Sequence, residues 1–285
     1  MKKILITGKN GYISKNLVKF LENKNEKVEA ISIRNNNINN IDFNKYEVII
    51  HAAALVHKKE NKVKNKNDFF EINTNLTEKI AKKAKLAGVN HFIFLSTMSV
   101  FGIERGIINE QTQLNPKSLY GKSKLLAEEI ILDLEDDFFK ISIVRPPIVY
   151  GEKCTGNYNV LSSLAKKTPI FPEYKNNRSM IYIENLTNFI YIIYKQKKRG
   201  IFHPQNSDYV QTSNIYRTIR KHHLKKSMNT KVFNKLISLL MKQIKIVEKV
   251  FGDLVYDQEF TTYDFKYELV GFENSIIISE GEKND

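Results

Sequence analysis

The sequence predicts a doubly wound α/β fold, with helices on both faces of a parallel sheet, followed by a smaller second lobe. Two observations support this fold class. Short apolar runs alternate with segments of helical spacing along the first 150 residues, which is typical of repeated strand and helix units. In addition, a glycine-containing turn follows the first apolar run directly and opens the first helical segment.

The elements of the first half follow one another regularly. Prolines stop the last strand, and Gly88 ends the second helix, as each residue type commonly does. The expected strands occupy residues 2–8, 27–34, 46–54, 91–97 and 140–147. The expected helices occupy residues 12–25, 69–88 and 118–134.

The pattern beyond residue 151 is less regular. It contains helical segments near 158–167 and 186–196 and a short strand near 179–183. We therefore predict two domains, 1–150 for dinucleotide binding and 151–285 as a smaller substrate-binding lobe interleaved with the first. Residues 233–251 are amphipathic and basic, which suits a membrane surface or a partner, but the favoured interpretation is an ordinary helix whose apolar face is buried in the core.

Composition limits the class of protein. The chain has 42% apolar and 27% charged residues, a formal net charge of +14, and one cysteine, Cys154, so an internal disulfide and a cysteine-based metal site are excluded. Lysines are spread over the whole chain without interleaved aromatic residues, so we expect no nucleic-acid partner. No run approaches the roughly 20 apolar residues of a membrane span. We expect a cytoplasmic protein without an integral membrane segment or a bound metal.

The first turn is a candidate phosphate-binding site. Gly8 and Gly11 lie between the first strand and the first helix, where glycines permit a tight turn and close approach of a pyrophosphate to the helix N-terminus. Ser14 stands at the third glycine position, so the motif is incomplete. The alternative is a plain strand-to-helix turn.

The end of the second strand bears on the choice of cofactor. An acidic residue there favours NAD, whereas an arginine favours the additional phosphate of NADP. This strand ends with Ser32 and Arg34 and offers no carboxylate, so NADP is favoured over NAD. The alternative is that Arg34 is a solvated charge at the strand end.

Hydroxyl residues and a Tyr–Lys pair form a candidate catalytic group. Ser96, Thr97 and Ser99 follow the fourth strand, at the edge of the sheet where ligands bind in such folds. Tyr120 and Lys124 are four residues apart on the next predicted helix, so their side chains lie on one face and serve one point in space.

These motifs resemble those of one family. The chain is similar to extended short-chain dehydrogenases/reductases of the NAD-dependent epimerase/dehydratase group, which have a Rossmann-like fold. The resemblance runs from the first strand to at least Tyr209, through TGKNGYIS, HAAA, LSTMSVFG, YGKSK, RPPIVYG and NNRSMIYIENL. Within the group the chain is most similar to bacterial capsule and O-antigen proteins that act on UDP-N-acetyl-6-deoxy-4-ketohexosamines.

The resemblance implies a role for each catalytic candidate. Tyr120 is the general acid or base, and the Lys124 ammonium lowers its pKa toward the working pH and holds the nicotinamide ribose. Thr97 hydrogen-bonds the substrate oxygen. His51 and His57, which flank the alanines after the third strand, are interpreted as packed or loop histidines.

The resemblance also implies binding residues. Asp42 would meet the adenine amine, and Asn73 would lie in the helix behind the dinucleotide. Arg178 would grip the substrate pyrophosphate, and Asn157 would be a second contact to the nucleotide sugar. The remaining cofactor-binding candidates lie in the first turn and after the third strand: Thr7, Gly8, Asn10, Gly11, Tyr12, Ile13, Ala52, Ala53 and Ala54.

Departures from the family pattern narrow the activity. Dehydratases of the group follow their threonine with Asp-Glu, whereas Met98 and Ser99 follow Thr97, so dehydration is not expected. Enzymes that also epimerise carbons 3 and 5 carry a cysteine where Ser99 stands. Many 4-epimerases have asparagine where this chain has Ile148, so one contact to phosphate or cofactor is missing.

The first hypothesis is therefore an NADPH- or NADH-dependent 4-ketoreductase. It would reduce a UDP-4-keto-6-deoxy-N-acetylhexosamine to a 6-deoxy sugar such as UDP-N-acetyl-D-fucosamine or its quinovosamine epimer, for surface polysaccharides. The second is a UDP-sugar 4-epimerase with tightly held NAD. The third is a nucleotide-binding protein without turnover. Family members often dimerise through two helices, one of which carries the Tyr–Lys pair, so a homodimer is also an expectation.

Overall fold

The computed structural model describes residues 3–33, 38–56 and 65–281. The chain forms two compact units, and we describe each by itself. Unit 1 comprises residues 1–102, 113–146 and 187–204, and unit 2 comprises residues 103–112, 147–186 and 205–285. The sequence analysis divided the chain at residue 150. In the structure residues 103–112 join unit 2 and residues 187–204 return to unit 1.

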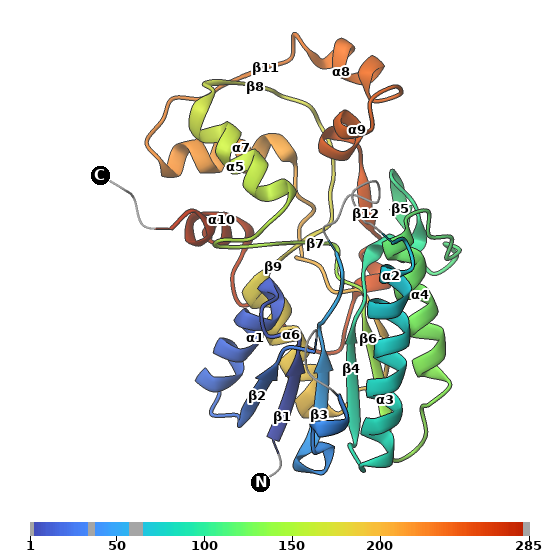
Figure 1. The fold of residues 1–285 in the computed structure, drawn as a ribbon. Coiled ribbons are helices and arrows are strands. Elements are labelled where there is room, and N and C mark those ends of the chain that lie inside the picture. Colours follow the sequence, from blue (N-terminus) through green and yellow to red (C-terminus); the bar gives the residue numbers. More distant parts are fainter. Residues whose placement is uncertain (1–2, 34–37, 57–64, 282–285) are drawn as a thin grey trace. The chain divides into compact units, whose positions relative to one another are not determined.

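A parallel six-stranded sheet is the centre of unit 1 (Figure 1). Its order is β10-β6-β4-β3-β1-β2, and every neighbouring pair is parallel. The order reverses between β1 and β3, which makes their carboxyl ends the switch point of a doubly wound sheet. The predicted fold class is confirmed. The strands are β1 Lys3–Thr7, β2 Val28–Ile31, β3 Tyr46–His51, β4 His91–Leu95, β6 Lys140–Val144 and β10 Gly200–Phe202.

Helices cover both faces of this sheet (Figure 1). Ile80 and Ala84 of α3 and Ile131 of α4 pack with Leu5 and Phe92 of the strands in one buried cluster. Figure 1 shows α1 and α6 on the opposite face. The helices are α1 Tyr12–Asn23, α2 Asp68–Phe70, a π-helical turn Glu71–Asn75, α3 Leu76–Leu86, α4 Leu119–Leu132 and α6 Ile183–Gln196, whose first residues belong to unit 2.

The start of α4 is fixed by its local sequence. Ser118 caps the helix, and its hydroxyl accepts a hydrogen bond of 3.0 Å from the backbone N–H of Gly121. A Cβ on Gly121 would lie 2.8 Å from the carbonyl oxygen of Ser99, so only glycine lets the helix approach this closely. The first turn of α4 therefore lies directly against the loop that follows β4.

Unit 2 is built from short elements. Three two-stranded parallel pairs, β7–β9, β8–β11 and β12–β5, accompany a group of helices. The strands are β5 Gly106–Ile108, β7 Ile148–Tyr150, β8 Ile170–Pro172, β9 Met180–Tyr182, β11 Met228–Thr230 and β12 Leu254–Tyr256. The helices are α5 Asn157–Lys167, α7 Thr212–His222, α8 Asn234–Leu240, α9 Lys245–Phe251 and α10 Phe272–Glu280.

The prediction for residues 233–251 was wrong. The segment forms two short helices, α8 and α9, because a turn at residues 241–244 interrupts it. In α8 Ile237 is buried, as is Met241 just beyond its end, whereas Leu236 and Leu239 are more than half exposed. Two buried residues one helical turn apart are enough to attach so short a helix to the core. Most of its apolar face therefore remains in contact with solvent.

The described part of the chain contains no helix that combines the length and apolar character needed to cross a bilayer.

Candidate functional site

The three predicted catalytic residues lie in unit 1 at the end of β4 and the start of α4. Thr97 caps the short 3₁₀ helix Met98–Phe101, where its hydroxyl accepts a hydrogen bond of 3.1 Å from the backbone N–H of Ser99. Tyr120 and Lys124 lie on successive turns of α4. A Cβ on Gly121, the residue after Tyr120, would lie 2.8 Å from the carbonyl oxygen of Ser99, so the start of α4 packs against the loop that holds Thr97. The catalytic role of these residues stays a prediction.

Lys124 is a fully buried amine. Its Nζ lies 3.7 Å from the centroid of the Phe94 ring and has no hydrogen-bond partner within the described residues. Burial lowers the pKa of Lys124 to about 7, an effect that the Glu128 carboxylate opposes. A buried ammonium with unused donors is costly, so this position suits a ligand that brings oxygen acceptors.

The state of Tyr120 differs from the expectation. Burial raises the pKa of the phenol to about 12, and the hydrogen bond from Thr97 acts in the opposite direction. Burial is the largest effect on this pKa, and the lowering expected from Lys124 is not among its causes in this structure. Tyr120 therefore holds its proton at neutral pH and is able to act as an acid.

The turn after β1 is shaped for close backbone approach. Gly8 has a φ of +88°, and a Cβ there would lie 2.8 Å from Cα of Ala53. Gly11 is the N-cap of α1 and supplies no side-chain cap, so the first N–H groups of the helix remain available to an anion. Ser14, at the third glycine position, is buried, and its hydroxyl donates to the carbonyl of Thr7 at 3.5 Å.

The other dinucleotide-binding candidates surround this turn. Ala53 is buried against Gly8, and Ala52 and Ala54 on either side of it are partly exposed. Asn10 is exposed in the turn, whereas Tyr12 and Ile13 in the first turn of α1 are half-buried. The carboxyl ends of β1 and β3 thus bring these residues to one edge of the sheet, as the switch-point rule requires.

A buried hydrogen-bond chain fixes the end of β1 to the helix layer. The Thr7 hydroxyl lies 2.7 Å from Nδ1 of His51, whose Nε2 lies 2.9 Å from the hydroxyl of Thr77. Burial and the Lys124 charge lower the pKa of His51 to about 3, so the ring is neutral and one nitrogen accepts. Phe94 stacks on this ring at a centroid distance of 5.8 Å. His51 is a packed residue, which confirms its interpretation, and His57 lies outside the described residues.

Asn73 has a positioning role. Its amide oxygen accepts from the Leu55 N–H at 2.7 Å, and its NH₂ donates to the Leu55 carbonyl and to the Ser123 hydroxyl at 3.3 Å and 3.0 Å. The residue is fully buried, so its donors are used within the protein. We expected Asn73 to bind the dinucleotide. In the structure its role is indirect, because its side chain holds the segment after Ala54 against α4.

A buried ion pair lies on the same helix as Lys124 and was missed by the sequence analysis. Nη2 of Arg145 lies 2.6 Å from Oε2 of Glu128, and the Ser96 hydroxyl donates to the same carboxylate. Glu128 is four residues after Lys124, so its charge acts on the ammonium through the helix face that they share. The spacing Tyr120, Lys124, Glu128 was a signal for the position of Glu128 on this helix face, but not for its partner Arg145, which follows β6.

The structure gives less support to the two remaining candidates for dinucleotide binding, Asp42 and Arg34. Asp42 is exposed and caps a 3₁₀ helix, where its Oδ1 accepts from the N–H and the side-chain amide of Asn44 at 3.2 Å and 2.9 Å. These bonds lower the pKa of its carboxyl. The geometry thus gives Asp42 a local structural role, and adenine binding stays a prediction. Arg34 lies outside the described residues.

The substrate-binding candidates lie in unit 2. Arg178 is buried, its Nη1 donates to the carbonyl of Gly252 at 2.9 Å, and its Nε has no hydrogen-bond partner within the described part of the chain. Burial lowers the pKa of this guanidinium, while Asp253 and Glu104 raise it. Asn157 is exposed at the first position of α5. Arg178 therefore has a donor that is free to bind an anion.

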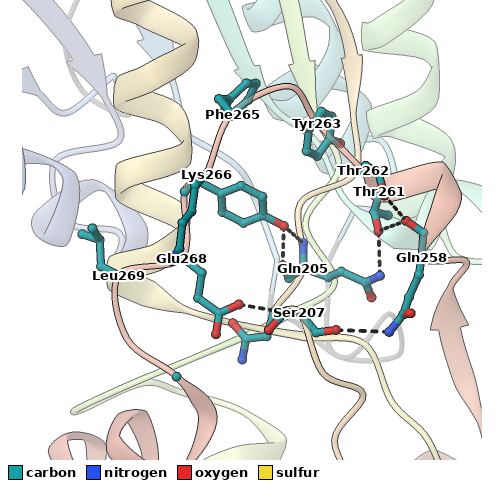
Figure 2. Close-up of a pocket in the computed structure, with 13 residues that line it drawn as sticks. Gln205, Ser207, Gln258, Thr261, Thr262, Tyr263, Phe265, Lys266, Glu268 and Leu269 are labelled. Atoms are coloured by element: carbon teal, nitrogen blue, oxygen red, sulfur yellow. Dashed lines mark hydrogen bonds between the residues drawn. The ribbon is translucent and has the colours of Figure 1, made fainter.

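Unit 2 also contains a cavity of about 600 Å³ that the sequence analysis did not predict. Its polar groups bond mainly to one another, as Figure 2 shows. The Tyr267 hydroxyl donates to the carbonyl of Gln205 and accepts from its N–H, and the N–H of Ser207 donates to Glu268 at 2.8 Å. None of the predicted site residues lines this cavity, so we assign it no part in the chemistry.

The residues of unit 1 fit a nicotinamide dinucleotide. Three observations agree: the glycine turn that a Cβ would obstruct, the uncapped N-terminus of α1, and the buried Nζ of Lys124 without a hydrogen bond. These features suit a pyrophosphate at the turn and a polar ligand group at the lysine.

Gly8→Ala is predicted to abolish dinucleotide binding, because the new Cβ would fill the space that Ala53 requires. It should also destabilise the fold by about 1–3 kcal/mol through the strained φ. Isothermal titration and denaturant unfolding measure the two effects. Gly88→Ala is the matched control, since Gly88 also has positive φ, at +69°, but no atom lies within 4 Å of its Cβ position. If both variants still bound dinucleotide equally, the close approach would have no functional meaning.

Lys124→Met is predicted to stabilise the ligand-free protein and to remove dinucleotide binding. The folded pKa of about 7 lies below the unfolded value of about 10.4, so the buried charge costs most below pH 7, and the cost disappears as pH rises toward 10. Replacing a buried charge with an apolar residue commonly stabilises by about 1–4 kcal/mol.

Denaturant unfolding at several pH values measures this change, with the exposed Lys122→Met on the same helix as control. A stabilisation that did not diminish with rising pH would show that burial does not lower the pKa of Lys124 in the folded protein.

Comparison with known proteins identifies the family. The model of the NAD dependent epimerase/dehydratase family matches residues 4–203. A UDP-glucose 4-epimerase of Vibrio cholerae is 29% identical over 314 aligned positions, which cover 99% of this chain and 94% of that protein. The solved structure of a UDP-glucuronic acid 4-epimerase from Bacillus cereus with UDP-glucuronic acid and NAD has a TM-score of 0.72 at 18% identity and covers 98% of both chains.

A second solved structure, a dTDP-4-dehydrorhamnose reductase from Bacillus anthracis in complex with NADP, has a TM-score of 0.66 at 22% identity, covering 82% of this chain and 86% of that one. At these identities the structural likeness establishes the fold alone, whereas the family match covers more than half of the sequence. The chain belongs to the NAD-dependent epimerase/dehydratase family.

Proposed function

We propose that the protein reduces the 4-keto group of a UDP-4-keto-6-deoxy-N-acetylhexosamine to the corresponding UDP-6-deoxy-N-acetylhexosamine. The observation that carries this proposal is the pairing of Tyr120 with the buried Lys124 one turn later on α4, whose start packs against the loop that holds Thr97. A nicotinamide dinucleotide bound at the glycine turn supplies the hydride for carbon 4. The residues of the chain then have to orient the ketone and deliver a proton to its oxygen.

The protonation state of Tyr120 supports the reductive direction. Reduction of a ketone requires a proton donor at the oxygen, and a phenol with a pKa of about 12 carries its proton at neutral pH. Thr97 donates a hydrogen bond to the same oxygen and stabilises the negative charge that develops there. Lys124 holds the dinucleotide ribose with its otherwise unused donors.

The buried arginine of unit 2 supports the proposed substrate class. Arg178 presents a partly unpaired guanidinium, which is the natural ligand for the oxygens of a UDP pyrophosphate. Asn157, exposed at the start of α5, is proposed as a second contact to the nucleotide sugar. We place the product in the synthesis of bacterial capsule or O-antigen polysaccharides, on the strength of the sequence resemblance. Arg34 supports NADPH as the reductant.

UDP-sugar 4-epimerisation is the second candidate. The full-length similarity to the Vibrio cholerae UDP-glucose 4-epimerase supports it, and it uses the same three residues. The two reactions differ in their cofactor balance. A reductase consumes one reduced dinucleotide per product, whereas an epimerase regenerates its own and releases none.

Tyr120→Phe is predicted to retain dinucleotide affinity and to lose about 100- to 10,000-fold in turnover, because only the proton donor is removed. The assay combines UDP-N-acetylglucosamine, a 4,6-dehydratase and NADPH, and follows NADPH absorbance with NMR of the product. Tyr46→Phe, a buried tyrosine of β3, is the control. Product without NADPH consumption, or interconversion of UDP-glucose and UDP-galactose, would establish the epimerase instead.

Arg178→Lys is predicted to raise the KM for the UDP-sugar about tenfold and to leave dinucleotide affinity unchanged. The charge remains, but the planar fork that binds two phosphate oxygens is lost. Arg220→Lys is a matched control, since Arg220 is equally buried in unit 2 and its Nε and Nη1 bind the backbone carbonyls of Lys226, Ala165 and Thr168. UDP titration that detects no difference between the two variants would make Arg178 a structural residue.

A further inference from the structure

Residues 224–244 of unit 2 are a segment rich in exposed apolar and basic side chains. Figure 1 shows this segment in orange, running from the end of α7 through β11 to α8. Seven large apolar side chains in it are exposed by 41% to 82%: Leu224, Met228, Val232, Phe233, Leu236, Leu239 and Ile244. Single exposed apolar residues are ordinary, but a group of this size in one short segment indicates a surface that binds something.

Lysines accompany these apolar residues without carboxylates to balance them. Five exposed lysines lie in the segment: Lys225, Lys226, Lys231, Lys235 and Lys242. Residues 224–247 contain no Asp or Glu at all. Within the described residues none of these lysines forms an ion pair, whereas Lys249, just beyond the segment, reaches Glu104 at 3.9 Å. No carboxylate within the segment therefore offsets its lysines.

The side chains of α8 and of the turn after it divide into a few that are buried and a larger group that is exposed. Ile237 and, just past the helix end, Met241 are four residues apart and buried, so they attach this part of the chain to unit 2. Leu236 and Leu239 are three apart on an exposed face. Lys235 is exposed next to Leu236 on the helix, and Lys242 is exposed in the turn that follows it. Apolar residues bordered by lysines, facing away from the core, are the pattern of a segment that lies in a membrane interface.

We propose that the surface formed by residues 224–244 docks on an anionic lipid bilayer. Its leucines, valine and phenylalanine would enter the boundary between headgroups and acyl chains, and its lysines would contact the acidic headgroups. A second copy of the chain fits this surface less well, because a symmetric contact would bring two sets of unbalanced lysines together. Single-stranded nucleic acid also fits less well, because Phe233 is the only aromatic residue in the segment on which a base could stack.

The proposal is independent of the reaction, so its test uses binding alone. The full chain is sedimented with phosphatidylcholine vesicles that contain or lack phosphatidylglycerol. We expect binding to the anionic vesicles only, and we expect it to be lost in about 1 M NaCl, where the Debye length falls to about 3 Å.

Two variants separate the electrostatic and apolar contributions. Lys235→Gln should weaken partitioning about fivefold, which corresponds to about 1 kcal/mol per basic residue near an anionic surface. The double variant Leu236→Ser, Leu239→Ser should weaken it about tenfold or more, because both side chains lose their burial in lipid. Lys79→Gln and Leu86→Ser, an exposed lysine and an exposed leucine of α3 in unit 1, are the matched controls and should bind as the unmodified chain does.

Unchanged thermal unfolding of all four variants verifies that the fold is intact, since every substituted side chain is exposed. Failure to bind either kind of vesicle overturns the proposal. So does equal binding to both kinds, or equal loss of binding in the control variants. A concentration-dependent dimer that Leu236→Ser dissociates, without vesicle binding by the unmodified chain, would assign the surface to a second copy.

Discussion

The burial of the Lys124 ammonium is the constraint on which the site in unit 1 depends. Hydrophobic packing alone would expel a charge from a position against the Phe94 ring, and its depressed pKa records that cost. Three arrangements keep the lysine there. The close approach at Gly121 fixes the start of α4, Glu128 supplies an opposite charge on the same helix face, and Arg145 compensates that carboxylate. The fold thus keeps the Lys124 ammonium buried at an energetic cost, and its N–H groups are available as hydrogen-bond donors to a ligand.

The same constraint explains why so many polar residues lie beneath the carboxyl ends of the strands. The chain Thr7, His51, Thr77 ties β1 and β3 to the helix layer, and Asn73 ties the segment after Ala54 to Ser123 on α4. Each partner is buried and hydrogen-bonded, so the group rigidifies the site at little cost. The dinucleotide turn and the Tyr–Lys pair are therefore connected through protein rather than placed independently.

The sequence predicted what depends on local pattern and missed what depends on distant partners. Strand and helix alternation, the Gly8 turn and the Tyr120–Lys124 spacing are local, and the sheet and α4 follow them. The roles of Asn73 and Arg145 depend on residues that are far away in sequence, so no short window reveals them. The direction of the Tyr120 pKa shift was missed because burial dominates it, and burial is a property of the folded chain. Residues 233–251 were misjudged because periodicity shows an apolar face but not what covers it.

Lysine side chains have different roles in the two units, because one is buried and the others are exposed to solvent. Lys124 is buried, loses part of its proton affinity and presents its donors to a ligand at one defined point. Lys231, Lys235 and Lys242 are exposed, form no ion pair with the described residues, and are proposed to act together at an anionic surface. A net charge of +14 therefore describes neither feature by itself. The effect of each charge depends on the balance of desolvation and pairing at its position, and in this chain the unbalanced positions are those where we propose that a ligand or a membrane binds.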